Sequence, residues 1–104
     1  MNVRPREPVL ERDVQHRVAA IYSAIGAHVY WMSQPRMSRV TPGVPDLYIL
    51  HPRLGATWFE VKAKNGKQRP AQKRFQEQCE QAGVVYLIGG IDVALKHVQQ
   101  KAAA

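Results

Sequence analysis

The feature that most constrains the fold is a pair of strand-like runs at residues 46–51 and 56–62. Both runs are rich in apolar, β-branched and aromatic residues, and the segment Pro52-Arg53-Leu54-Gly55 separates them. A connection of this length that contains glycine is typical of a β-hairpin. We therefore predict that the two runs are antiparallel neighbours in one sheet.

A helix and a strand are predicted before this hairpin. Apolar residues between Val9 and Ile25 recur at steps of three and four, as on one face of an amphipathic helix. Residues 27–32 are aromatic and β-branched and indicate a strand, whereas residues 33–45 are polar, basic and contain proline, as loops do.

A helix, a strand and a final helix are predicted after the hairpin. Pro70 begins a segment with apolar residues at helical spacing, and Gly83 can end this helix. The apolar run at 84–88 is typical of a strand covered on both faces. The last helix extends from Asp92 to about Gln100. The order αβββαβα predicts an α/β fold, with a mixed sheet of about four strands flanked by helices and its last strand parallel to a neighbour.

The length of 104 residues suits one hydrophobic core, so we expect a single domain over residues 1–104. Residues 1–8 are expected to be flexible and residues 101–104 to form a frayed tail. The sequence contains no apolar run of the roughly 18 residues that a membrane span needs and no recognisable targeting segment. We expect a cytoplasmic protein without a membrane partner.

The chain is strongly basic, with 15 Lys and Arg against 8 Asp and Glu and a formal charge of +7. Such a charge favours a polyanionic partner, and nucleic acid is the first candidate, although many basic domains bind no anion specifically. Cys79 is the only cysteine, and the four histidines show no metal-ligand spacing. A structural zinc site is therefore not expected.

The chemistry is predicted to centre on three residues of the hairpin. The motif Gly43-Val44-Pro45-Asp46 precedes Glu60-Val61-Lys62, with Glu60 fourteen residues after Asp46. Glu60 and Lys62 are two residues apart in a strand, so they share one face. Asp46 opens the neighbouring strand, and the two carboxylates can converge. Two carboxylates suit a Mg²⁺ ion that activates water for phosphodiester hydrolysis, and Lys62 can place positive charge at the transition state.

Each of these residues also has a simpler interpretation. Glu60 and Lys62 could form an ion pair on a solvated sheet face, and Asp46 could be a turn residue after Pro45. Glu11 lies on the same helical stripe as Val14 and is a candidate site residue, or an exposed acid near the helix N-terminus. Gln72 lies on the stripe of Phe75, which directs its amide towards the sheet, unless it is one of several surface glutamines.

Taken together, Gly43-x-Pro45-Asp46-Leu47, Glu60-Val61-Lys62, a turn containing Gly66, and Gln72 resemble the VRR-NUC domain of the PD-(D/E)xK nuclease superfamily. The resemblance covers residues 9–98 and includes Glu11-x-x-x-Gln15. It implies a restriction-endonuclease-like core and a Mg²⁺- or Mn²⁺-dependent DNA endonuclease. Asp46, Glu60 and the Val61 backbone carbonyl would hold the metal, with Glu11 as a further candidate ligand. Lys62 would activate water, and Glu11 and Gln72 would assist catalysis.

Stand-alone members of this length are typical of phages and bacteria and resemble dimeric Holliday-junction resolvases. The resemblance therefore implies a homodimer acting on four-way or otherwise branched DNA. Phosphate contacts are predicted from basic residues on both sides of the site, which are Arg36, Arg39, Lys64, Lys67 and Arg69. The alternatives left open are a non-catalytic basic module that binds nucleic acid and, less favoured, a protein-interaction domain.

Overall fold

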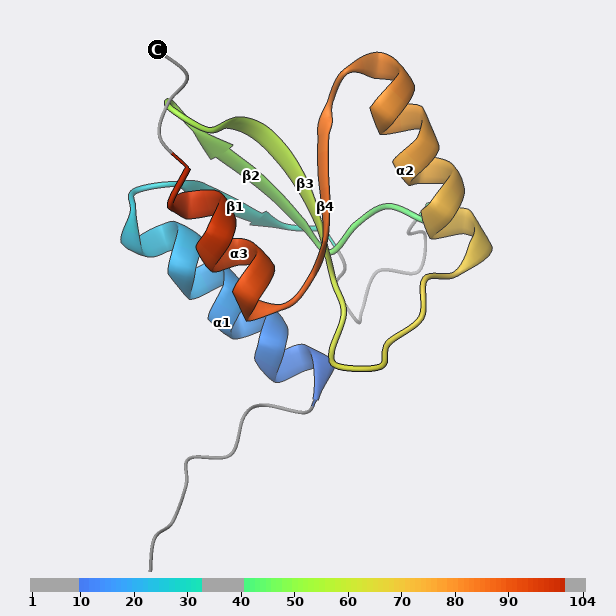
Figure 1. Ribbon diagram of the computed structural model, residues 1–104, viewed down its shortest axis with the longest axis horizontal. Coiled ribbons are helices and arrows are strands. Elements are labelled where there is room, and N and C mark those ends of the chain that lie inside the picture. The colour runs from blue at the N-terminus through green and yellow to red at the C-terminus, as the bar shows by residue number, and fades with distance from the viewer. Residues whose placement is uncertain (1–9, 33–40, 101–104) are drawn as a thin grey trace, which may run out of the picture.

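The structure is a computed structural model that describes residues 10–32 and 41–100. The predicted flexible start and frayed tail lie outside these residues. Within them the predicted order αβββαβα is confirmed (Figure 1). The elements are α1 (Glu11–Ala24), β1 (His28–Trp31), β2 (Leu47–His51), β3 (Gly55–Val61), α2 (Pro70–Ala82), β4 (Val85–Gly89) and α3 (Ile91–Val98).

The four described strands form one mixed sheet in the order β1-β2-β3-β4. The hairpin prediction is confirmed, because β2 and β3 pair antiparallel with Tyr48 opposite Trp58. β4 runs parallel to β3, as expected for a strand reached through a helical crossover. Helices α2 and α3 both contact β4 from opposite faces of the sheet, as predicted for a strand covered on both faces. β4 is also an edge strand of the described sheet, and Val85 at its start is exposed.

The hydrophobic core lies between the sheet and the helices α1 and α3, which lie side by side in Figure 1. Strand alternation sends Phe59 to this face, where its ring meets Tyr22 of α1 edge to face. Trp58 points to the opposite face and contacts Phe75 of α2 in the same geometry. Glu60, two residues from Trp58, shares the α2 face of the sheet. No described helix is long and apolar enough to cross a membrane.

A buried hydrogen bond joins the two helices of the core. The Tyr22 hydroxyl lies 2.7 Å from Nδ1 of His97, which links α1 to α3. Burial raises the pKa of Tyr22 and lowers the pKa of His97 below its ordinary value of 6.5. The lowered pKa means that the stability associated with neutral His97 is present above pH 6.5. It is lost as the pH falls through the folded-state pKa.

Replacing Tyr22 by Phe is expected to lower the free energy of unfolding by about 1–3 kcal/mol at pH 7.5, because the buried His97 nitrogen loses its partner. Urea denaturation followed by circular dichroism measures the change. Ser23→Ala is the control, since it removes an exposed hydroxyl from the same helix. Equal losses in the two variants would contradict the proposed contribution of the Tyr22–His97 bond.

Candidate active site

Asp46 lies immediately before β2, and its carboxylate is fixed against the end of β3. Its Oδ2 accepts a hydrogen bond of 2.9 Å from the backbone N–H of Val61. Its own backbone carbonyl accepts a hydrogen bond of 2.7 Å from the N–H of Met32, beyond β1. Asp46 is therefore held between the two neighbouring strands, with its carboxylate next to the residue that follows Glu60.

Glu60 is the buried acid of the site, with 2% of its surface exposed. Its pKa is raised to about 8, first by burial and then by the charge of Asp46 and a hydrogen bond between the two side chains. Lys62 partly offsets this rise, because its positive charge favours the ionised carboxylate. The Oε1 atom of Glu60 is buried and has no hydrogen-bond partner. The predicted convergence of Asp46 and Glu60 is thus observed in the structure.

Lys62 lies between two acids. Its Nζ is 3.7 Å from Oε2 of Glu60 and 4.0 Å from Oε1 of Glu11. The Lys62 side chain is largely buried, whereas that of Glu11 is 47% exposed. Glu11 is thus exposed and also close to the site lysine, and its role as a site residue remains a prediction. Glu11 is the first residue of α1, and its carboxylate approaches the site through Lys62.

Comparison with solved structures identifies a relative with this arrangement of strands and helices. A structure described as a VRR_NUC domain is 30% identical, with a TM-score of 0.68, and the match covers 86% of this chain and 95% of that one. The chain belongs to the VRR-NUC family. Its fold is therefore a nuclease-type fold that is restriction-endonuclease-like, as the resemblance implied. No family sequence model and no curated protein matches the chain.

The donor atoms of this VRR-NUC domain fit a hard cation. Within residues 10–32 and 41–100, no group of three His, Cys, Asp or Glu side chains is placed to bind a metal. Asp46 and Glu60 supply two carboxylates, which is the number that typically holds Mg²⁺ together with water and substrate oxygens. The unpartnered Oε1 of Glu60 offers a buried acceptor for such an ion. Glu11 is paired with Lys62, so its ligand role remains a prediction.

Gln72 has a structural role at the start of α2. Its Oε1 accepts a hydrogen bond of 2.8 Å from the backbone N–H of Arg69, the residue before the helix. The arginine side chain has no acceptor for the reciprocal bond, so only the Gln72 half of a capping box can form. This differs from the expectation that the Gln72 amide is directed at the sheet. A catalytic role of Gln72 remains a prediction.

Gly43 places the Asp46 loop against α2, a role that the sequence interpretation did not assign. Its φ is +90°, and a Cβ built there would lie 2.3 Å from the carbonyl oxygen of Ala71. The neighbouring atom belongs to the backbone and cannot rotate away. Glycine is therefore required both for the left-handed conformation and for the close approach of the two segments.

Replacing Gly43 by Ala is expected to reduce the free energy of unfolding by about 2–4 kcal/mol, since backbone strain adds to a steric clash with Ala71. Gly26→Ala is the matched control. Gly26 has a similar φ of +83°, but nothing lies within 4 Å of the position of its Cβ. Thermal unfolding of both variants measures the difference, and equal losses would show that contact with Ala71 is unimportant.

The structure describes only three of the five basic residues that are predicted to contact phosphate. Lys64, Lys67 and Arg69 are exposed in the segment that joins β3 to α2, which begins directly after the Glu60-Val61-Lys62 motif. They therefore lie along the chain next to the acidic pair. Arg36 and Arg39 lie outside the described residues. DNA contact by these five residues remains a prediction.

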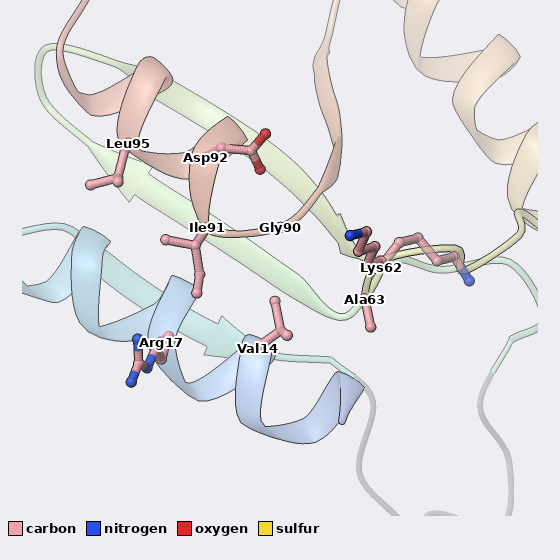
Figure 2. A pocket seen from close by; sticks show the side chains of 9 residues that line it. Val14, Arg17, Lys62, Ala63, Gly90, Ile91, Asp92 and Leu95 are labelled. Atoms are coloured by element: carbon pink, nitrogen blue, oxygen red, sulfur yellow. The ribbon is translucent and has the colours of Figure 1, made fainter. Parts of the chain in front are cut away.

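A groove of about 640 Å³ lies between α1 and α3 and shares Lys62 with the candidate site. Figure 2 shows Val14 of α1 and Ile91 of α3 pointing towards each other across it. The lining is completed by residues of the same helices and of the two connecting segments, which are Arg17, Lys62, Ala63, Lys64, Gly90, Asp92 and Leu95. Of this lining, only Lys62 and Lys64 were predicted from the sequence as functional residues.

Proposed function

We propose that this VRR-NUC domain is a DNA endonuclease that requires Mg²⁺ or Mn²⁺. The observation that carries the proposal is the meeting of Asp46 and Glu60 at the ends of two adjacent strands, with the Lys62 ammonium 3.7 Å from Glu60. An isolated surface ion pair does not explain this arrangement, because the Glu60 side chain is almost fully buried. A buried carboxylate next to a second acid is costly without a cation, even beside a lysine.

Asp46, Glu60 and the Val61 backbone carbonyl would hold the cation in this proposal. When bound, the ion would supply positive charge to the phosphoryl oxygen and to the attacking water. The water oxygen forms a bond to phosphorus and gives up a proton as the bond to the leaving nucleotide oxygen breaks and that oxygen takes up a proton. Lys62 holds its charge beside the reacting groups, where it stabilises the negative charge that develops in the transition state. The N–H of Val61 keeps the Asp46 carboxylate oriented throughout.

Branched DNA, including four-way junctions, is the proposed substrate. Lys64, Lys67 and Arg69 are exposed and can bind phosphates, which positions DNA without reading its bases. Phosphate contacts alone distinguish substrates through the shape and deformability of DNA. The net charge of +7 supports such contacts along an extended surface.

The direct test is incubation of the purified protein with four-way, flap and linear DNA in Mg²⁺, Mn²⁺ or chelator. Metal-dependent cleavage with preference for a branched substrate is expected. Absence of cleavage in every substrate and metal would overturn the proposal. Salt-sensitive DNA binding that ignores the metal, without cleavage, would instead support the non-catalytic binding module.

We also propose that the protein is a homodimer that pairs through the half of the α2 sheet face formed by His28, Tyr30, Tyr48 and Leu50. Phe75 of α2 contacts Trp58 and Tyr86 of β3 and β4, whereas Tyr30 of the edge strand β1 remains 51% exposed. None of the four residues is Lys, Arg, Asp or Glu, so two basic chains can meet there without opposing like charges. A two-fold dimer would place two active sites for symmetric cuts.

Tyr30→Glu is expected to shift the protein from dimer to monomer, because dimerisation would bury one carboxylate from each chain in an apolar interface. Sedimentation velocity over a range of concentrations measures this shift. Arg53→Glu, an exposed change in the β2–β3 turn, serves as the control and should remain dimeric. A monomeric wild-type protein at all concentrations would contradict the dimer.

A further inference from the structure

The groove between α1 and α3 has the size and lining of a site for one nucleotide. Its volume of about 640 Å³ lies within the range of small-ligand sites. Val14 is almost fully buried and forms part of the floor, whereas Leu95 is 42% exposed and borders the opening. Apolar side chains of this kind can contact the faces of a base that has left its stack.

The charged residues of the groove suit the phosphate at one end of a nucleotide and the base at the other. Arg17 of α1 and Lys62 and Lys64 after β3 provide three positive charges, and Asp92 of α3 is the only acid in the lining. Figure 2 shows Asp92 on the α3 side and Arg17 on the α1 side. A phosphate is favoured near Arg17 and Lys64, and Asp92 can accept hydrogen bonds from a base amino group.

The groove is continuous with the candidate active site through Lys62. This residue lines the groove, and its ammonium lies 3.7 Å from Glu60. A DNA strand whose scissile phosphate lies at Asp46 and Glu60 would therefore bring a neighbouring nucleotide to the groove. A base can enter only when it is unpaired, and extracting it from a duplex costs a few kcal/mol.

We infer that the groove binds the unpaired nucleotide next to the scissile phosphodiester, with its base against Val14, Ile91 and Leu95 and its phosphate at Arg17 and Lys64. This inference rests on the proposed nuclease function and narrows its substrate class. The enzyme selects branched DNA that has an unpaired nucleotide at the cut, such as a flap or a fork, over continuous duplex.

The test is binding of a fluorescently labelled flap and of a continuous duplex of equal length, measured by anisotropy in chelator. The wild-type protein is expected to bind the flap about tenfold more tightly, because the duplex must first release a base. An abasic residue at the first unpaired position should lower flap affinity to that of the duplex. Equal affinity for normal and abasic flaps would overturn the inference.

Arg17→Glu tests the phosphate end of the groove. It is expected to weaken flap binding about tenfold, whereas Arg53→Glu, the same charge change in the turn at the other end of β2, should weaken it no more than about twofold. Circular dichroism confirms that both variants fold. Equal effects of the two changes would show that only overall charge matters and would overturn the inference.

The cleavage assay separates this inference from the proposed function. A wild-type protein that prefers the flap through Arg17 but cuts no DNA in Mg²⁺ or Mn²⁺ would support the groove and overturn the nuclease proposal. A protein that cuts DNA but binds flap and duplex equally would support the nuclease and overturn the groove assignment.

Discussion

Asp46→Asn and Glu60→Gln are each expected to reduce DNA cleavage by on the order of a thousandfold or more, because each removes one of the two acids proposed to hold the cation. Both replacements keep the size of the side chain, and the amide oxygen introduced by Asp46→Asn can still accept the hydrogen bond from Val61. Cleavage of a labelled four-way junction or flap under single-turnover conditions, in Mg²⁺ and in Mn²⁺, measures the loss.

DNA binding should respond differently from cleavage. In chelator, both variants should bind DNA at least as tightly as the wild-type protein, since the basic residues are intact and neither change adds a negative charge. Glu77→Gln on the exposed surface of α2 is the control and should retain full cleavage. Equal cleavage by Asp46→Asn, Glu60→Gln and the wild-type protein would point to a contaminating nuclease and would contradict the assignment of this site.

The order of elements is predictable from the sequence because the signals involved are local. The hairpin follows from two apolar runs and a short turn containing Gly55, and α2 follows from Pro70 and Gly83 at its two ends. The position of β4 in the sheet is not encoded in its own local sequence. A continuous apolar run is compatible with either a central or an edge strand, and only the order of pairing places Val85 at an exposed edge.

The acidic pair is predictable for a similar reason. Strand alternation fixes the face of Glu60, and the hairpin brings Asp46 beside it. Helical periodicity is a weaker guide for side chains at helix ends. Glu11 has the phase of the buried stripe but begins its helix, and Gln72 has the phase of Phe75 but caps its helix instead.

Arg17 could not be identified from sequence. It lies on the exposed side of α1, and nothing in its local pattern distinguishes it from other surface arginines. Its position in the groove depends on the packing of α3 against α1, which is a tertiary contact between segments far apart in the chain. The requirement for glycine at position 43 likewise depends on the approach of Ala71.

The buried acid should also make the stability of the metal-free protein depend on pH. The pKa of Glu60 is about 8 in the folded protein against an ordinary value of 4.5. Between these values the folded protein retains a proton that the unfolded chain has lost, so stability falls as the pH rises. The contribution is fully present below pH 4.5 and is lost as the pH passes about 8.

Thermal unfolding in chelator at pH 5, 6, 7 and 8 measures this effect as the difference between wild-type protein and Glu60→Gln. The subtraction removes groups common to both proteins, including His97, whose lowered pKa acts in the opposite direction. The melting temperature of the wild type should fall relative to Glu60→Gln by about 5 °C or more across this range, which corresponds to a change of at least about 1 kcal/mol. A difference that does not vary with pH would contradict the raised pKa of Glu60.

Adding Mn²⁺ at pH 8 should restore the thermal stability that the wild-type protein loses as the pH rises. A cation between Asp46 and Glu60 favours the ionised carboxylates and binds only the folded state, so it raises the melting temperature with increasing concentration. Glu60→Gln should respond much less, because the amide carries no charge to attract the ion. If both proteins gain equally, the ion binds elsewhere, and Asp46 and Glu60 are not the ligands of the metal.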